Sequence, residues 1–92
     1  MTLLASDSQA AVRRLFIVDD HPMIREGLCA QIAHEPLLEV CGHAEDVVDA
    51  LAAVQDAAPD LVIVDISLKS GNGIDLVKRL KAKDPQLVIL VW

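Results

Sequence analysis

The chain has 92 residues, 53% of them hydrophobic, which is enough for one small domain with a core but not for two. Fourteen acidic residues against eight basic ones give a net charge of −6, which argues against nucleic-acid binding by this segment. Phe16 and Trp92 are the only aromatic residues, so the core is expected to be aliphatic.

The lack of recognisable targeting signals in this sequence and its cysteine usage predict a cytosolic protein. No apolar run approaches membrane-spanning length. Residues 1–11 lack the features of a signal peptide and are interpreted as a flexible tail before a single domain over residues 12–92. Cys29 and Cys41 match neither a metal spacing nor a disulfide framework, and we interpret them as small apolar residues of a reducing compartment.

Four apolar runs predict strands, over residues 14–19, 37–44, 60–66 and 86–92. The first, third and fourth are continuous and β-branched, which is typical of strands buried on both faces of a parallel sheet. The second alternates, with Glu39 among apolar residues, and suits an edge strand.

The segments between these runs carry helical patterns. Pro22 fits the first turn of one helix, which Pro36 prevents from continuing. Asp46 can cap a second helix that stops at Pro59. A third helix is expected from about residue 74 to residue 83, with Asp75 and Arg79 as an i,i+4 ion pair.

Strands that alternate with helices predict an α/β fold with a doubly wound parallel sheet and right-handed crossovers. For a small sheet of this kind the common strand order is 2-1-3-4. That order places the first helix on one face and the other two helices on the opposite face. It also makes the first and third strands neighbours, roughly 4.8 Å apart.

Three carboxylates are predicted to meet at one edge of this sheet. Asp19 and Asp20 end the first strand and Asp65 ends the third, at the carboxyl edge where ligands bind in open α/β folds. Unpaired carboxylates raise one another's pKa, and a hard cation such as Mg²⁺ resolves the conflict. Asp65 is the candidate nucleophile for an aspartyl-phosphate, and Asp19 and Asp20 are candidate metal holders. The backbone carbonyl of Ser67 could also reach the ion.

Simpler structural roles compete with this interpretation at single positions. Asp20 could cap the first helix. His21 is interpreted as an exposed loop residue, because no second His or Cys stands at ligand spacing, and Lys69 as a solvated side chain. Residues 71–73 are interpreted as a turn-forming loop. Three acids on neighbouring strand ends nevertheless favour the chemical interpretation.

With these residues identified, the chain resembles the receiver domain of two-component response regulators over nearly everything from Val12 to Trp92. The stretch VDDHPMIREGL (18–28) is similar to the NarL/FixJ-type subfamily, whose members carry a LuxR-type helix-turn-helix output domain. The stretch DLVIVDISLKSGNGIDLVKRL (60–80) is similar to the family's phosphoacceptor strand, loop and third helix.

The resemblance implies a flavodoxin-like (CheY-like) fold and phosphoryl transfer from the phosphohistidine of a histidine kinase to Asp65. It also implies that Asp20 and Asp65 are Mg²⁺ ligands, that Asp19 holds the ion through water and that the Ser67 carbonyl completes the site. The chain is then a regulatory phosphoacceptor rather than an enzyme, and it regulates transcription through an output domain.

Two features depart from the family pattern. The family commonly has a proline where Lys69 stands, which bears on the rigidity of that loop. The sequence also stops before the family's strand-four hydroxyl, its fifth strand, its last helices and the DNA-binding domain. We therefore expect an incomplete sheet, contact with DNA only through a missing helix-turn-helix domain, and a homodimer or domain swap through the open fourth strand.

Two alternatives remain open. A phosphatase of the haloacid-dehalogenase type needs Asp-x-Asp after its first strand, whereas Asp19 and Asp20 are adjacent and Asp65 belongs to another strand. A receiver-like module that works only through protein contacts would not need the intact acid trio.

Overall fold

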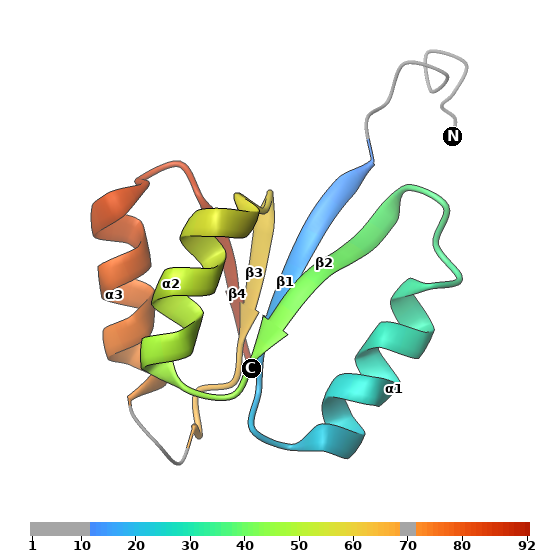
Figure 1. The fold of residues 1–92 in the computed structure, drawn as a ribbon, viewed down its shortest axis with the longest axis horizontal. Coiled ribbons are helices and arrows are strands. Elements are labelled where there is room, and N and C mark those ends of the chain that lie inside the picture. The colour runs from blue at the N-terminus through green and yellow to red at the C-terminus, as the bar shows by residue number, and fades with distance from the viewer. Residues whose placement is uncertain (1–11, 69–71) are drawn as a thin grey trace.

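The computed structural model describes residues 12–68 and 72–92, which form a four-stranded parallel sheet with three helices (Figure 1). The strands are β1 (Arg13–Val18), β2 (Leu38–Ala44), β3 (Leu61–Val64) and β4 (Val88–Val91), and the helices are α1 (Pro22–Ile32), α2 (Val47–Ala57) and α3 (Gly73–Lys83). The predicted tail (1–11), Lys69 and Gly71 lie outside the described residues. Within the described ranges, every helix is too short or too polar to cross a membrane.

The strand order is β2-β1-β3-β4, as predicted. β1 pairs in parallel with both β2 and β3, and Val18 lies opposite Val64 in the second of these pairings. The amide of Asp65 donates to the Val18 carbonyl (2.9 Å), which continues the pairing one step further. Asp19 and Asp65 therefore leave the sheet side by side at its carboxyl edge.

The sheet is covered by α1 on one face and by α2 and α3 on the other, as predicted (Figure 1). Successive side chains of a strand point to opposite faces. Phe16 and Val18 accordingly join an apolar cluster with residues of α2 and α3, whereas Leu15 and Ile17 pack in a smaller cluster with Ile32 of α1.

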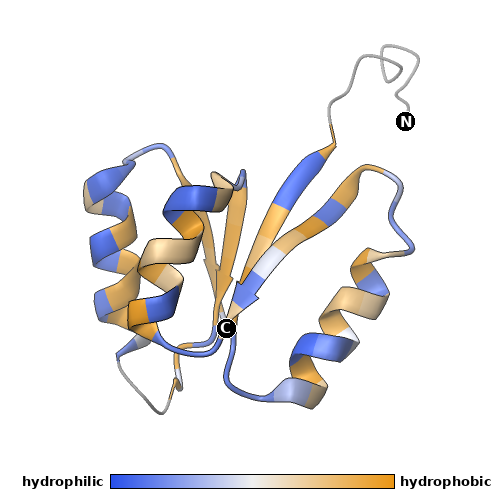
Figure 2. Ribbon diagram, in the orientation of Figure 1, coloured by the Kyte–Doolittle hydropathy of each residue, from blue (hydrophilic) through white to orange (hydrophobic). Residues whose placement is uncertain are grey.

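The fourth strand is exposed on the face that carries only the first helix, as expected for an open strand, and is not buried on both faces as its apolar run alone suggests. Val88 and Leu90 are 60% and 54% exposed. Both pair with β3 residues that belong to the cluster beneath α1, and they share that face of the sheet. In Figure 1, α1 lies beside β1 and β2, at the far side of the sheet from β4. Figure 2 accordingly shows β4 as an apolar strand with no helix on that face. The apolar run alone suggests burial on both faces, because it does not reveal which neighbours cover the strand, whereas the strand order indicates the open face.

Side chains cap two of the helices. Asp46 accepts a hydrogen bond from the Asp49 amide (2.8 Å), which confirms its predicted role at the start of α2. Asn72 does the same for α3, where its side chain accepts from the amides of Ile74 and Asp75. The predicted Asp75–Arg79 ion pair is present at 2.9 Å.

Gly73 does more than let a loop turn. It begins α3 and is buried against the chain that follows β3. A Cβ atom at this position would lie 2.8 Å from the Asp65 carbonyl oxygen and 2.9 Å from the Ile66 Cα. Both contacts are with backbone, so an added methyl group would displace the segment that carries Asp65.

We expect Gly73→Ala to lower the free energy of unfolding by about 1–3 kcal/mol, the usual effect of overpacking a tight contact. The matched control is Gly27→Ala in α1, where an added Cβ would meet nothing within 4 Å. The control should leave stability unchanged or raise it by up to about 1 kcal/mol, because alanine favours helix. Urea unfolding of both variants measures the difference, and equal values would contradict the close approach at Gly73.

Candidate functional site

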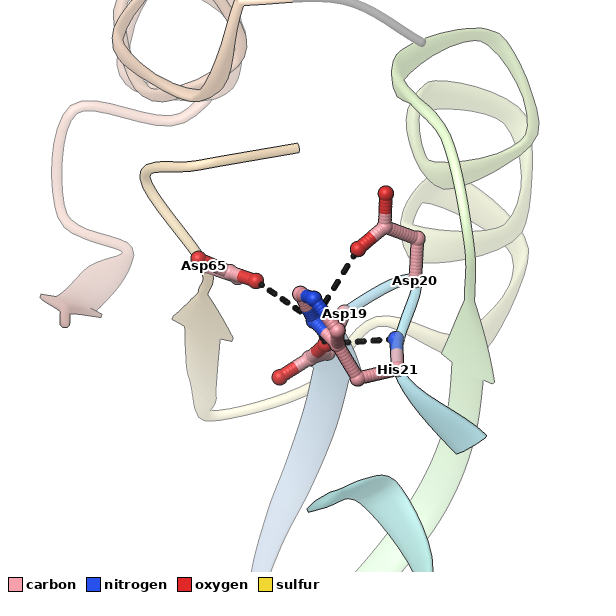
Figure 3. A group of neighbouring side chains, drawn as sticks. All are labelled: Asp19, Asp20, His21 and Asp65. Carbon is pink, nitrogen blue, oxygen red and sulfur yellow. Dashed lines mark hydrogen bonds and ion pairs between the residues drawn. The ribbon is translucent and has the colours of Figure 1, made fainter. Parts of the chain in front are cut away.

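The three predicted carboxylates come together at the carboxyl edge of the sheet. Asp19 and Asp20 follow β1 and Asp65 follows β3, and one oxygen of each lies within 4.8 Å of the others and of a nitrogen of His21 (Figure 3). Asp19 is 1% exposed and Asp65 is 7% exposed. Water therefore screens their charges poorly, and the site needs positive charge from another source.

When protonated, His21 supplies that charge, a role that its interpretation as an exposed loop residue did not include. Its ring is partly exposed, but Nδ1 lies 2.8 Å from Asp19 Oδ1, 3.1 Å from Asp20 Oδ1 and 3.3 Å from Asp65 Oδ2 (Figure 3). His21 is also the N-cap residue of α1, with extended backbone, so the capping role considered for Asp20 is wrong. The ring lies among the acids, which periodicity alone does not indicate.

A ring nitrogen carries at most one proton, so the His21 contacts cannot all be full hydrogen bonds. The shortest, to Asp19, is the best candidate for one, and the other two are mainly attractions between charges. The hydrogen bond with Asp19 raises the pKa of His21 above its ordinary value, partial burial opposes that change, and the charges of the three acids add to it. The protonated ring is thus favoured by the arrangement of the acids.

Ser67 holds Asp65 through two hydrogen bonds to the same oxygen. Its amide and its hydroxyl donate to Asp65 Oδ1 at 2.8 and 2.7 Å. Burial raises the pKa of the Asp65 carboxyl, but the two Ser67 hydrogen bonds and the His21 charge outweigh it and hold the pKa below its ordinary value. Asp65 is therefore ionised at neutral pH without a base to deprotonate it. The role expected of the Ser67 carbonyl stays a prediction.

Arg25 is a site residue that the sequence interpretation missed. Its Nη1 donates to the Asp19 carbonyl oxygen at 2.7 Å and lies 3.3 Å from Glu45 Oε1, and its side chain is 14% exposed. The guanidinium ties the first turns of α1 to the end of β1 and to the segment after β2. The sequence feature that could have identified Arg25 is its place as a basic residue about one helical turn beyond the acids, in a helix that starts beside them.

Two of the acids, Asp19 and Asp65, open onto a cavity of about 210 Å³. The cavity is lined by Asp19, His21, Ile24, Asp65, Ser67 and Trp92. A second cavity of about 230 Å³ lies between the C-terminal ends of α2 and α3, at the opposite edge of the sheet, and contains none of these acids. The candidate functional site therefore lies at the first cavity.

The donor set is one that a hard divalent cation accepts. Mg²⁺ prefers carboxylate oxygens and water, and it commonly takes a substrate phosphate as a further ligand. The Nδ1 atom of His21 contacts an oxygen of each acid, and it occupies the place that a bound cation would take. The geometry thus fits positive charge at this point and a phosphoryl group in the adjoining cavity.

Comparison with known proteins gives an independent result. A family model described as the response regulator receiver domain matches residues 15–92. The chain is 40% identical over 78 residues to the DNA-binding transcriptional activator DevR/DosR of Mycobacterium tuberculosis, a match that covers 85% of this chain and 36% of that protein. It is 37% identical over 78 residues to a protein-glutamate methylesterase/protein-glutamine glutaminase of Pyrococcus abyssi, which covers 85% of this chain and 21% of that protein.

A solved structure agrees with the fold. The crystal structure of a LuxR-family two-component response regulator from Aurantimonas sp. SI85-9A1 matches with a TM-score of 0.82 and 31% identity, over 88% of this chain and 58% of that one. Of the two curated relatives named above, the match covers 36% of the length of the first and 21% of the length of the second.

We expect Arg25→Ala to lower the free energy of unfolding by about 2 kcal/mol, because it removes a charged donor from a buried carbonyl. Arg25→Lys should retain part of that stability, since an ammonium can make one of the two contacts. The matched control is Arg79→Ala, which breaks the exposed pair with Asp75 and should change stability by less than about 0.5 kcal/mol. Urea unfolding provides the values, and equal losses in the two alanine variants would contradict the role given to Arg25.

Proposed function

Because this chain belongs to the response regulator receiver domain family, we propose that Asp65 is the residue on which it carries its phosphoryl group in two-component signalling. The observation that carries the proposal is the state of this carboxylate. It lies at the end of a central strand, is held by Ser67, has a lowered pKa and faces a cavity beside two further acids.

The chemistry follows from that state. Asp65 attacks the phosphorus of a phosphohistidine on a sensor histidine kinase, and a new oxygen–phosphorus bond forms as the nitrogen–phosphorus bond breaks. The electron pair of the broken bond returns to the imidazole of the donor. No general base is needed, because Asp65 is already ionised. Ser67 engages Oδ1 and thereby fixes the rotation of the carboxylate, while Oδ2 lies 3.3 Å from His21 Nδ1.

The proposed cofactor is Mg²⁺. Asp20 and Asp65 would ligate the ion directly, Asp19 would hold it through water and the Ser67 carbonyl would complete the set. When bound, the ion supplies charge that screens the anionic phosphoryl group from the anionic nucleophile. The support from the structure is the position of His21 Nδ1, which marks where positive charge is stabilised.

Asp65→Asn should abolish phosphoryl uptake and leave the fold intact, since the amide keeps the shape of the side chain and removes the nucleophile. Incubation with labelled acetyl phosphate and Mg²⁺, followed by measurement of protein-bound label, tests this expectation. The matched control is Asp56→Asn, on the exposed side of α2, which should incorporate label as the wild type does. Label on the Asp65→Asn variant would move the acceptor to another residue.

Mg²⁺ should raise the melting temperature, because it relieves a repulsion that exists only in the folded state. At ten times its Kd the ion stabilises the fold by about 1.4 kcal/mol through mass action, which corresponds to several degrees in a domain of this size. Asp20→Asn should reduce the shift. Thermal melts with Mg²⁺ and with EDTA measure the effect, and an unchanged wild-type melting temperature would argue against the metal site.

The family match excludes the haloacid-dehalogenase alternative, and the acids on two different strands agree with that exclusion. We further propose that the domain regulates an output rather than turning over a separate substrate. A receiver-like module that works only through protein contacts would gain nothing from an ionised, oriented Asp65. Phosphoryl uptake separates the two functions.

The proposed setting is a cytoplasmic response regulator in which one receiver domain spans residues 12–92 after a tail over residues 1–11. Its output is proposed to bind DNA through a helix-turn-helix domain. The support is the NarL-type stretch 18–28 and a relative that is named a DNA-binding transcriptional activator. Because another relative is named a methylesterase, the choice of output rests mainly on that stretch.

We also propose that two copies of this 92-residue chain associate through β4. Within the described residues β4 pairs only with β3, and Val88, Leu90 and Trp92 are more than half exposed. A second copy of the same strand offers both a backbone edge and apolar side chains of matching kind. Light scattering should show a dimer, and a monodisperse monomer would contradict the association.

A further inference from the structure

The His21 ring nitrogen lies among the three acids, close to an oxygen of each. Nδ1 is within 3.3 Å of an oxygen from each of the three carboxylates. Mg²⁺ binds oxygen at about 2.1 Å, so an ion bound directly to Asp20 and Asp65 would lie in the space that the ring nitrogen fills, 3.1 and 3.3 Å from their oxygens. The ring and the ion therefore exclude one another.

The ring is a poor candidate for a ligand of that ion. Mg²⁺ prefers oxygen donors and retains water, whereas imidazole nitrogen suits softer transition metals. A ring that is hydrogen-bonded to Asp19 through Nδ1 also presents a proton to the acids rather than a lone pair.

The ring also has room to leave the acids. The side chain of His21 is 41% exposed, makes no capping bond to α1 and borders the cavity of about 210 Å³. Its backbone, in contrast, is tied in place, because its amide donates to Asp19 Oδ1 and its carbonyl accepts from the Arg25 amide. Rotation about the side-chain bonds thus suffices to empty the position without moving α1.

We propose that His21 is a built-in competitor of the divalent cation, and that its ring must swing out of the acid cluster before the cation binds. The inference rests on the metal site of the proposed function and adds a residue that sets the affinity of this site for the cation. When only a fraction of the molecules has the ring swung out, the apparent Kd is the intrinsic Kd divided by that fraction. Removal of the ring therefore strengthens binding of the cation.

The test is a Mg²⁺ titration of the wild-type chain, His21→Ala and His34→Ala. Trp92, the only tryptophan, lines the same cavity and gives a fluorescence signal, and amide NMR shifts of Asp20 and Asp65 give a second measure of Kd. His34→Ala is the matched control, since it removes an exposed ring just beyond the other end of α1. His21→Gln replaces the alanine variant should the latter unfold.

We expect His21→Ala to bind Mg²⁺ about threefold or more tightly than the wild type, and His34→Ala to match the wild type. In the wild type, Mg²⁺ should also shift the ring resonances of His21 as its hydrogen bond to Asp19 breaks. Unchanged or weaker binding by His21→Ala, or a ring that keeps its bond to Asp19 in saturating Mg²⁺, would overturn the inference and leave the metal site standing. Absence of binding in all three proteins would instead overturn the metal site, and the inference with it.

Discussion

The mutual repulsion of three carboxylates is the constraint on which the rest of this structure depends. Parallel pairing of β1 with β3 brings Asp19 and Asp65 side by side, and Asp20 adds a third charge. Two unit charges 4 Å apart repel by about 4 kcal/mol at an effective dielectric of 20. Since a domain is typically stable by about 5–15 kcal/mol in total, the fold needs a positive partner at this point. His21 provides one within the chain, and the proposed Mg²⁺ provides a stronger one.

The acids are positioned mainly through the backbone. Arg25 binds the carbonyl of Asp19, and Gly73 packs against the carbonyl of Asp65. Ser67 then fixes one oxygen of the Asp65 side chain. Because backbone contacts do not depend on the charge of the carboxylates, they persist whether the positive partner is an imidazole or a metal ion. One cation can therefore replace another without rebuilding the edge of the sheet.

Features that depend on local pattern were predictable from the sequence. The apolar runs identified all four strands, and the Asp46 cap was identified from its position before an apolar helix. The strand order common to small doubly wound sheets is the observed one. Convergence of the acids followed from that order.

Features that depend on side-chain direction or on neighbours were not predictable. The His21 ring points to the acids through the rotation of its side chain, which sequence spacing does not report (Figure 3). Gly73 is required by a contact with Asp65, a residue eight positions earlier in the chain. Exposure of β4, in contrast, followed from the strand order, which leaves only one helix on that face, and not from the apolar run at residues 86–92.

Helix α1 connects the charge constraint to the fold. Its C-terminal end is held by apolar packing, since Ile32 is buried in the cluster with β1 and β3. Its N-terminal end is held mainly by polar contacts, because Ile24 is 43% exposed while the His21 amide and the Arg25 guanidinium both bind Asp19. His21, whose ring contacts the acids, thus also anchors the start of the helix through its amide. These polar contacts therefore hold α1 at the end where apolar packing contributes least.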